Sequence, residues 1–549
     1  MPKVILGPIL RFAGPTEATV WVETDEACEV GVLDSRSDTF CVAGHHYALL
    51  IVDGLEPGGT YPYEVSLNGE TSSRAPGEPE SLIRTPIEDD DRLNLAFGSC
   101  RVAVPHEPPY VYSKDRDEQG REVDSLVALS ERMKATPEPD WPDALVLLGD
   151  QVYAVEVPPS VAEKIKAKRS TDTGAGEEVA DFEEYTWLYQ HSLGDPAIGW
   201  LLSSLPSTMI FDDHDVTDDW NISGTWIEEQ RKKDWWRERI LGAYMSYWIY
   251  QHLGNLSPEE LRKDALLTKV RDNSDDATGL LRDYAATATD EVASTRWSYH
   301  RDFGRTRLVV IDSRAGRIVD DDDDRQMISD AQWDWVSEQL TGDIDHLLVA
   351  SSVPMLLSPG LHHLEAWNEA LCAGAWGKLA VSSSEKLRQA VDLEHWAAFG
   401  KSFDRLIDEL AAVGSGERGR APASIIMLAG DVHHAYIAEA EFPASRGVSS
   451  RMVQAVCSPM RNPLGQRERR IMRAALSKTG TAFTRFLARA AGVKKPPIDW
   501  EFIGPPTFDN QIGTIEIDGR TASVRIEKTS PDDWQAPRLR ESVTHRVTD

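Results

Sequence analysis

The sequence predicts an α/β protein in which an all-β domain precedes a larger domain built on a central sheet. Up to about residue 88, short strand-like stretches with alternating apolar residues are separated by turn residues. From residue 93 onward, short apolar runs are separated by helical stretches, which is typical of a sheet covered on both faces. The chain has 549 residues, more than one hydrophobic core usually holds, so we expect two or three domains.

The first domain is expected to be a β-sandwich over residues 1–88. Its predicted strands include residues 19–23, 29–32, 47–52 and 63–67, and the last of these leads into an Asn-Gly turn. Residues 55–65 have the pattern Leu-x-Pro-Gly-x-x-Tyr-x-Tyr-x-Val, which resembles the late strands of fibronectin type III sandwiches. Residues 72–91 are rich in Ser, Pro, Glu and Asp and are predicted to link this domain to a second one at 92–549.

The second domain contains six apolar runs of the length of buried strands. These are residues 95–97, 144–148, 208–211, 308–311, 346–350 and 425–429. Several of them end in Gly, Asp, Ser or His. Ligands of open α/β sheets bind beyond the carboxyl ends of the strands, so we expect the functional groups at these ends.

Two segments, at about 156–205 and 224–300, are predicted to be helical insertions. The second carries Trp and Tyr residues at roughly helical spacing, which favours a helix buried against the core; a lid over the site is the alternative. Residues 467–495 are basic and amphipathic and are expected to form a surface helix pair. Residues 512–517 and 521–527 are predicted to form a hairpin that completes a second sheet.

Charge and cysteine usage narrow the classes of function. The net charge of −32 disfavours sequence-independent binding to nucleic acids or anionic membranes, but not a small phosphate ester, because bound metal charge dominates locally. The apolar runs are too short for a membrane span.

The five cysteines lack CxxC spacing, so free thiols are favoured over a Cys28–Cys41 pair. The visible start lacks a signal peptide, which predicts a cytoplasmic protein, or a secreted one if the chain is a mature form. The oligomeric state stays open.

Four short motifs follow predicted strands. They are Gly-Ser-Cys at 98–100, Gly-Asp-Gln-Val-Tyr at 149–153, Asp-Asp-His-Asp at 212–215 and Gly-Asp-Val-His-His at 430–434. Each alone is weak evidence, because such residues are common in turns and helix caps. Together in one α/β domain they predict a site that holds two cations.

The donor types in these motifs differ in a way that predicts two unlike ions. Asp150 suits a bridging carboxylate, while the thiol of Cys100 and the phenol of Tyr153 suit a soft or ferric ion. Asp213 and Asp431 offer the hard oxygens that calcium, magnesium or manganese prefer. The adjacent His214 is predicted either to protonate a leaving oxygen or to stabilise the transition state.

The order of the motifs resembles that of calcineurin-type metallophosphoesterases, whose pattern is DxH, GDxxD, GNH-D/E and GHxH. The motif sequences in this chain resemble those of the alkaline phosphatase D (PhoD-like) family. They are GSC, GDxxY, DDH-D and GDVH. The likeness extends through residues 308–314, 332–335 and 350–354. It implies a four-layer α/β/β/α metallophosphoesterase core, and an enzyme that hydrolyses phosphate monoesters, diesters or both with metal-activated water at a binuclear or trinuclear site.

The resemblance also implies roles for individual residues. A ferric site would be formed by Cys100, Asp150, Tyr153 and His433, and a calcium site by Asp150, Asp213 and Asp431, with Mn²⁺, Mg²⁺ and Zn²⁺ as alternatives. His214 would be catalytic. Arg314 is predicted either to contact the substrate phosphate or to form an internal ion pair.

Some features depart from the family or admit other interpretations. Residues 218–221 are Asp-Asp-Trp-Asn where family members commonly have Asn-Asn-Trp, and the extra carboxylates would strengthen divalent binding or alter the phosphate pocket. We expect His434 to pack or to support the metal ligands rather than to bind metal, and the His pairs at 45–46 and 362–363 to be structural or exposed. The acidic run at 320–324 is expected to be a solvated loop rather than a calcium site. The alternatives to a phosphatase are a binding or adhesion protein with a non-catalytic core, or a diesterase of phospholipase or nucleotide specificity.

Overall fold

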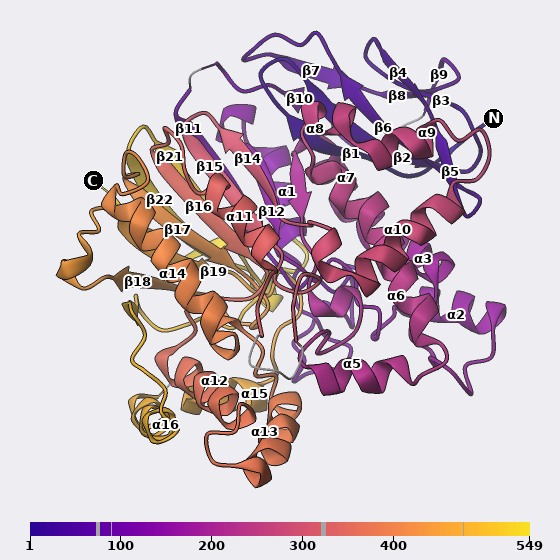
Figure 1. The fold of residues 1–549 in the computed structure, drawn as a ribbon. Coiled ribbons are helices and arrows are strands. Elements are labelled where there is room, and N and C mark those ends of the chain that lie inside the picture. Colours follow the sequence, from indigo (N-terminus) through magenta and orange to yellow (C-terminus); the bar gives the residue numbers. More distant parts are fainter. Residues whose placement is uncertain (73–76, 89, 320–324, 476, 549) are drawn as a thin grey trace.

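The computed structural model describes all 549 residues except 73–76, 89, 320–324, 476 and 549. The acidic run at 320–324 and part of the predicted linker at 72–91 therefore lie outside the described residues. Figure 1 shows the chain as two sheet-containing regions, with the N-terminal strands at the upper right and the larger sheets to the left.

The N-terminal region is an antiparallel β-sandwich, as predicted. One sheet has the order β1 (Val4–Ala13), β2 (Ala18–Thr24), β6 (His45–Val52), β5 (Phe40–Val42). The second has the order β4 (Ser35–Asp38), β3 (Glu29–Val32), β8 (Val65–Leu67), β9 (Glu70–Thr71), and β7 (Thr60–Tyr63) pairs with β10 (Ser81–Arg84). Alternate residues such as Val20, Val22, Val30 and Leu50 meet in one buried core between the sheets.

The larger region contains two sheets. One has the order β13 (Ser207–Met209), β12 (Ala144–Leu147), β11 (Arg92–Gly98), β21 (Gln511–Asp518), β22 (Thr521–Lys528), β23 (Arg540–Arg546). The other has the order β14 (Tyr299–Phe303), β15 (Thr306–Ile311), β16 (His346–Ser351), β17 (Ser424–Ala429), β19 (Arg451–Val456), β18 (Tyr436–Glu441), β20 (Asp499–Phe502). The predicted hairpin is β21–β22, and it pairs with β11 to extend the first sheet.

The alternation of side chains explains why the sheets stack. On β16, Leu348 and Ala350 join the core that also contains residues of β21 and β22, so this face meets the other sheet. Leu347 and Val349 point the other way, into a second core with α11 (Asp330–Gln339) and α14 (Gly400–Ser415). Helix α1 (Ser125–Ala135) packs against β21 of the first sheet. The chain is thus an α/β core preceded by a β-sandwich (Figure 1).

Both predicted insertions contain helices. The first holds α2 (Pro159–Lys168), α3 (Phe182–Leu193) and α4 (Pro196–Ser204). The second holds α5 (Gly224–Arg231), α6 (Trp236–Tyr247), a π-helical turn (Trp248–His252), α7 (Leu253–Asn255), α8 (Pro258–Lys263), α9 (Ala265–Arg271) and α10 (Thr278–Asp290).

The aromatic residues of the second insertion lie inside the molecule. Tyr247 stacks on Phe211 with 3.5 Å between ring centroids. Tyr250 lies 5.2 Å from the ring of Trp21, which belongs to the sandwich. The aromatic helix therefore joins the sandwich to the core, which is the buried arrangement that its spacing favoured over a lid.

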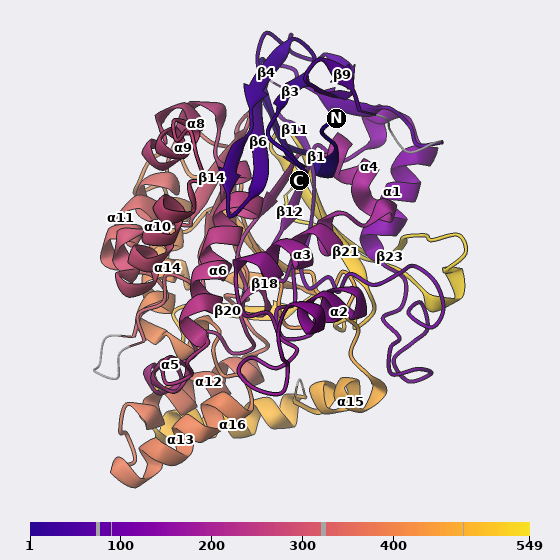
Figure 2. The ribbon, with the colours of Figure 1, turned by 90° about the vertical axis from the view of Figure 1, so that its right-hand side faces the viewer.

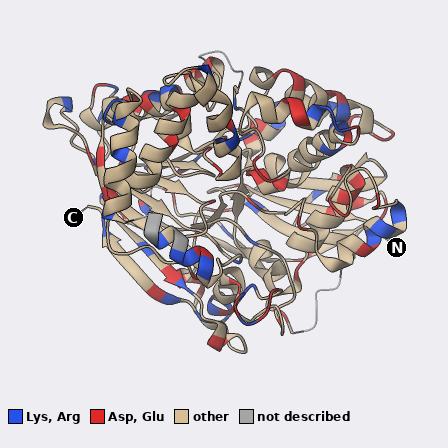
Figure 3. Cartoon of the chain, turned by 90° about the horizontal axis from the view of Figure 1, so that it is seen from below, with Lys and Arg blue, Asp and Glu red and all other residues tan. Residues whose placement is uncertain are grey.

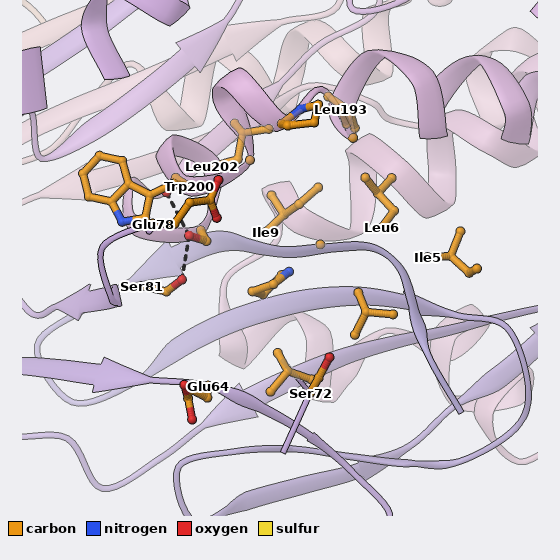
Figure 4. Close-up of a pocket in the computed structure, with 18 of the residues that line it drawn as sticks. Ile5, Leu6, Ile9, Glu64, Ser72, Glu78, Ser81, Leu193, Trp200 and Leu202 are labelled. Carbon is orange, nitrogen blue, oxygen red and sulfur yellow. Dashed lines mark hydrogen bonds between the residues drawn. The ribbon is translucent and has the colours of Figure 1, made fainter. Parts of the chain in front are cut away.

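A cavity of about 340 Å³ lies at the seam between β1 and α4. Its lining, drawn in Figure 4, includes Ile5, Leu6 and Ile9 of β1 and Trp200 and Leu202 of α4. A hydrogen bond of 2.8 Å between the hydroxyls of Ser81 and Ser203 crosses the seam beside the cavity. Its lining contains no residue of the four motifs, so it is a feature of domain packing.

The remaining helices form a lobe at the lower end of the molecule (Figure 2). The lobe consists of α12 (Pro359–Cys372), α13 (Lys378–Ala390), α15 (Gln466–Ala475) and α16 (Lys478–Ala490). The predicted surface helix pair corresponds to α15 and α16. Among the described helices, none combines the length and the apolar character that a membrane crossing requires.

Candidate metal centre

The four motifs meet because of how the strands pair. In the first sheet, β11, β12 and β13 run parallel, and Gly98, Leu147 and Met209 lie side by side at the strand ends. The loop after β17 of the other sheet joins them, since the backbone N–H of Asp431 donates to the Ser99 hydroxyl at 3.0 Å. The carboxyl ends of strands from both sheets thus supply one cluster of side chains.

The ligand loops have strained backbones. Cys100, Asp150, Asp431 and His433 all adopt positive φ, at 58°, 54°, 66° and 50°. This left-handed conformation is unfavourable for residues with a Cβ, by roughly 1–2 kcal/mol each, and recurs at functional sites. A Cβ on Gly149, whose φ is +102°, would lie 2.4 Å from the Cβ of Asp212, which explains the glycine before Asp150.

Three groups of side chains could each hold a cation, and the groups share residues. Within each group, the donor atoms lie within 4.8 Å of one another. The groups are Cys100, Asp150 and His433; Asp150, Asp213 and His214; and Asp212, Asp213 and Asp431. The phenol of Tyr153 lies 3.3 Å from the Asp150 carboxylate and so adjoins the first group. The structure therefore brings together every residue that the sequence proposed as a metal ligand, and adds Asp212.

Among the described residues, Cys100 and Tyr153 have neutral hydrogen-bonding neighbours apart from the Asp150 carboxylate. The Cys100 thiol is fully buried, 3.1 Å from the hydroxyls of both Ser99 and Ser458. The Tyr153 hydroxyl accepts a bond of 3.3 Å from the amide of Asn462. Burial, and then nearby carboxylates, raise the pKa of both Cys100 and Tyr153 well above their ordinary values. Both groups stay protonated unless a cation offsets that cost.

The carboxylates show the same need for positive charge. Asp150 is 1% exposed, and its Oδ1 atom has no hydrogen-bond partner among the described residues. Burial raises the pKa of Asp150 well above its ordinary value, and Asp212 and Asp213 raise it further. Asp212 and Asp213 each keep one such oxygen as well, so three carboxylates of one cluster leave an oxygen that a cation would satisfy. These donors fit the metal ions that the family resemblance implies.

Arg314 lies behind the cluster and is fully buried. It pairs with Asp212 and Glu394, and its Nη2 lies 3.2 Å from Asp213 and 3.5 Å from Asp431. The contacts seen are thus the internal ion pairs, one of the two expected roles. A contact between Arg314 and a substrate phosphate stays a prediction.

His214 lies at the exposed edge of the cluster. Its side chain is 19% exposed, and its ring lies 4.7 Å from that of Tyr153. Burial lowers the pKa of His214, but Asp213 and Asp150 outweigh burial and raise it to about 9. The imidazolium form is therefore favoured at neutral pH, which suits a proton donor.

His395 and Glu365 lie beside the cluster, although no motif in the sequence indicates a role for either. His395 places Nε2 2.9 Å from Asp431, and its Nδ1 lies 2.6 Å from Glu365 of α12. Burial opposes the charged imidazole, but Glu365 and Asp431 raise the pKa of His395 well above its ordinary value. Neither residue belongs to a motif, and they come together only in the folded chain.

The segment at 218–221, where this chain departs from the family, also supports the site. The backbone N–H of Asp219 donates to Asp213 at 3.1 Å, and the Asn221 amide donates to the Arg314 carbonyl at 3.1 Å. Asp218 is exposed, with a carboxylate oxygen 3.7 Å from Nε2 of His214. The added carboxylates thus lie at the mouth of the site.

Two histidines that the sequence assigns to packing, His434 and His362, lie against aromatic rings, and the cysteines are unpaired. His434 bonds the Val432 carbonyl at 2.7 Å and lies against Tyr436 and Phe508. His362 is buried against Phe403 and Trp500. All five cysteines are free thiols.

A two-sheet α/β core with carboxylate, thiol, phenol and imidazole groups gathered at its strand ends defines a phosphoesterase. A family model described as PhoD-like phosphatase matches residues 128–485, well over half of the chain. The chain therefore belongs to the PhoD-like phosphatase family. A second model, described as a domain of unknown function (DUF7800), matches residues 1–85.

Solved structures agree with the fold. The chain is similar to one titled "Structure of PhoD", with a TM-score of 0.59 and 13% identity over 99% of this chain and 90% of that one. Two further matches carry no weight: a Bacteroides ovatus GH5 xyloglucanase in complex with a XXXG heptasaccharide (TM-score 0.17, 9% identity, 78% and 94% coverage) and a maltogenic amylase from S. marinus (TM-score 0.16, 9% identity, 95% and 76% coverage). Among curated protein sequences, none matches the chain.

Proposed function

We propose that this chain is a metal-dependent phosphoesterase that hydrolyses small phosphate monoesters, diesters or both. The observation that carries the proposal is the convergence of the four strand-end motifs on three groups of donors, each within 4.8 Å. Membership of a phosphatase family makes hydrolysis of a phosphoric ester the expected reaction. The motif residues at positive φ support it, because strained ligand loops are retained where function needs them.

The donor set favours two unlike ions, one ferric and one calcium. Cys100, Asp150, Tyr153 and His433 would hold the ferric ion, because only a strongly acidic cation keeps a buried thiol and phenol deprotonated. Asp150, Asp213 and Asp431 would hold calcium through hard oxygens. When bound, such ions activate a water molecule and polarise the phosphoryl oxygens. Mn²⁺, Mg²⁺ and Zn²⁺ are the alternatives.

The protein's own groups orient the site and move protons. His395 and Arg314 hold Asp431 from two sides, at 2.9 and 3.5 Å, which fixes the direction of its carboxylate. His214 is partly exposed at the edge of the cluster and is the group that would protonate the departing oxygen.

Elemental analysis of the purified protein, paired with activity, tests the proposal. We expect iron and calcium in the wild type, and loss of aryl phosphate hydrolysis on strong chelation. Cys100→Ser is expected to lose the iron and keep the calcium, whereas Asp213→Asn is expected to do the reverse. Two equal zinc ions would refute the ferric assignment, and hydrolysis that survives complete removal of metal would refute the phosphoesterase mechanism.

The substrate is the open part of the proposal. A panel of an aryl phosphate, a bis-aryl phosphate, a nucleotide and a phospholipid separates monoesterase from diesterase and phospholipase specificity. We expect hydrolysis of at least one of the two aryl esters, since both present a small phosphoryl group to a site with an open edge at His214 and His433. Binding without turnover of any ester would favour the non-catalytic alternative.

A further inference from the structure

The helix pair α15–α16 has a charge opposite to that of the whole chain. Residues 466–495 contain nine basic residues and one acidic residue, in a protein of net charge −32. The basic residues are Arg467, Arg469, Arg470, Arg473, Lys478, Arg485, Arg489, Lys494 and Lys495. Because surface charges are screened beyond about 10 Å, a partner that touches this pair meets the local charge rather than the total. Figure 3 views the molecule from below, the side on which the pair lies.

The same helices expose large apolar side chains. Phe483 and Phe486 of α16 are 62% and 67% exposed. Trp376, in the link between α12 and α13, is 48% exposed, and Leu379, in the first turn of α13, is 94% exposed. These are four of the nine large apolar side chains exposed in the described part of the chain. Apolar residues that gather on one surface mark a site of interaction.

Helix geometry orders these groups around α16. At about 100° per residue, Phe483 and Phe486 lie about 60° apart on one side, and Arg485 and Arg489 lie about 40° apart on the next. The Trp376 indole donates to the Ala490 carbonyl at 3.3 Å, and Ala490 falls between the two phenylalanines in the helical projection. The buried Ala488 faces the opposite side. An apolar stripe therefore runs beside a basic one on the outer face of the helix.

The basic stripe borders a cavity of about 200 Å³. Its lining includes His363 of α12, Arg485, Arg489, Lys494 and Trp500. Arg489 and Lys494 form no ion pair with any described residue, and Arg485 donates to the His363 ring at 3.2 Å. Burial, together with the charges of Arg485 and Arg489, lowers the pKa of His363 to about 4. The lining also contains Lys495 and Asp499, which pair with each other, so the positive charge left without an ion pair among the described residues is that of Arg485, Arg489 and Lys494.

We propose that α15–α16 is a docking surface for an anionic lipid bilayer. Phe483, Phe486 and Trp376 would enter the boundary between headgroups and acyl chains, while Arg485, Arg489 and Lys494 contact the lipid phosphates. An amphipathic helix with a basic face and aromatic residues on the apolar face binds membrane surfaces in this way. A nucleic acid would complement the charge but would leave the apolar stripe beside it in water.

The surface lies near the metal centre along the chain. Asn462, whose amide contacts Tyr153, precedes α15 by four residues, and Gln466 at the start of that helix bonds Asp115. Docking would therefore hold the centre close to the bilayer. The proposal concerns binding alone and does not depend on the ions or on the substrate.

Vesicle co-sedimentation of the full chain tests the proposal. We expect binding to phosphatidylcholine vesicles that contain phosphatidylglycerol, weaker binding to pure phosphatidylcholine, and loss of binding at high salt. Phe483→Ser with Phe486→Ser should lower the partition coefficient by about tenfold for each phenylalanine removed. Arg485→Gln with Arg489→Gln should lower it roughly fivefold for each arginine.

Matched variants elsewhere serve as controls. Leu280→Ser removes an exposed apolar side chain from α10, and Lys263→Gln with Lys269→Gln removes two exposed charges from α8 and α9. We expect all of these to bind vesicles like the wild type. The proposal is overturned if anionic vesicles do not bind, or if the α16 variants bind as well as the controls. It is equally overturned if the phenylalanines mediate self-association in gel filtration, or if single-stranded DNA binds in place of vesicles.

Discussion

Two buried charged groups in this protein, the Arg11 guanidinium and the Asp150 carboxylate, differ in whether the described residues satisfy all their hydrogen bonds. At the seam between sandwich and core, Arg11 is fully buried, and its guanidinium donates to the carbonyls of Ser207, Tyr250 and Gln251 at 3.1, 2.6 and 2.9 Å. At the metal centre, by contrast, Asp150 keeps a buried oxygen without a partner among the described residues. The protein itself supplies partners for the buried Arg11 cation, whereas three carboxylates of the centre, Asp150, Asp212 and Asp213, each keep an oxygen without a hydrogen-bond partner among those residues. A buried charge that the protein satisfies stabilises the fold, and a group of unsatisfied carboxylate oxygens favours a cation.

The largest expected effect comes from removing the shared ligand of the centre. Asp150→Asn is expected to reduce kcat/KM by about 10³–10⁴-fold, because both proposed ions lose a ligand. With metal removed from both proteins, the Asp150→Asn variant should be at least as stable as the wild type, because burial already disfavours the charged Asp150 carboxylate. Steady-state kinetics and thermal unfolding after chelation measure the two quantities. A variant that unfolds at a lower temperature would assign Asp150 a structural role and remove the contrast.

The seam should respond in the opposite way. Arg11→Met keeps much of the volume but removes the guanidinium donor from three buried carbonyls, and we expect a loss of about 3–5 kcal/mol in the free energy of unfolding. Hydrolysis per folded molecule should stay within a factor of about two, since Arg11 contacts no residue of the centre. Urea titration gives the stability. A large loss of kcat with unchanged stability would contradict this division.

The residues beside the metal ligands are expected to have an intermediate effect. Glu365→Gln weakens the support of His395, which in turn contacts Asp431, and we expect about 10–100-fold weaker calcium binding or activity. Iron content should not change, because the ferric ligands do not touch Glu365. Calcium titration of the purified variant, followed by elemental analysis, separates the two ions. Equal loss of both metals would indicate that the substitution disrupts the packing of α12 rather than the support of His395 alone.

The smallest expected effect is the pH dependence of the seam. His45 lies 2.8 Å from Glu183 and 3.3 Å from Glu23. Burial lowers the pKa of His45, but the two glutamates outweigh burial and raise it to about 9. Its folded pKa thus exceeds the unfolded value of about 6.5, so its stabilising effect is complete below pH ~6.5 and is lost as the pH rises through ~9.

A variant isolates this contribution. We expect His45→Gln to lower the free energy of unfolding by on the order of 1 kcal/mol at pH 6, because partial exposure screens the ion pairs, and to match the wild type above pH 10. Urea titrations of both proteins across this range measure the difference. A difference that grows with rising pH would contradict the assignment.

The sequence alone determined the local features of this protein. Alternating and continuous apolar runs located the strands of the sandwich and of the core, because burial on one or both faces dictates residue choice along the strand. The motifs at 98–100, 149–153, 212–215 and 430–434 identified every proposed metal ligand that the structure brings together. At strand ends the chain must turn and side chains are free to face a ligand. Functional residues at these positions can therefore be recognised in the sequence.

Only the tertiary structure decided how these pieces combine. The predicted runs divide between two sheets, and the pattern of burial cannot specify this, because a buried strand looks the same whichever sheet it joins. His395 and Glu365 lie far from the motifs in sequence and meet Asp431 only across α12 and the loop before α14. The sequence left open whether Arg314 contacts the substrate phosphate or forms internal ion pairs. In the folded chain it forms ion pairs because four carboxylates surround it. Contacts between distant segments depend on packing geometry, which no local pattern records.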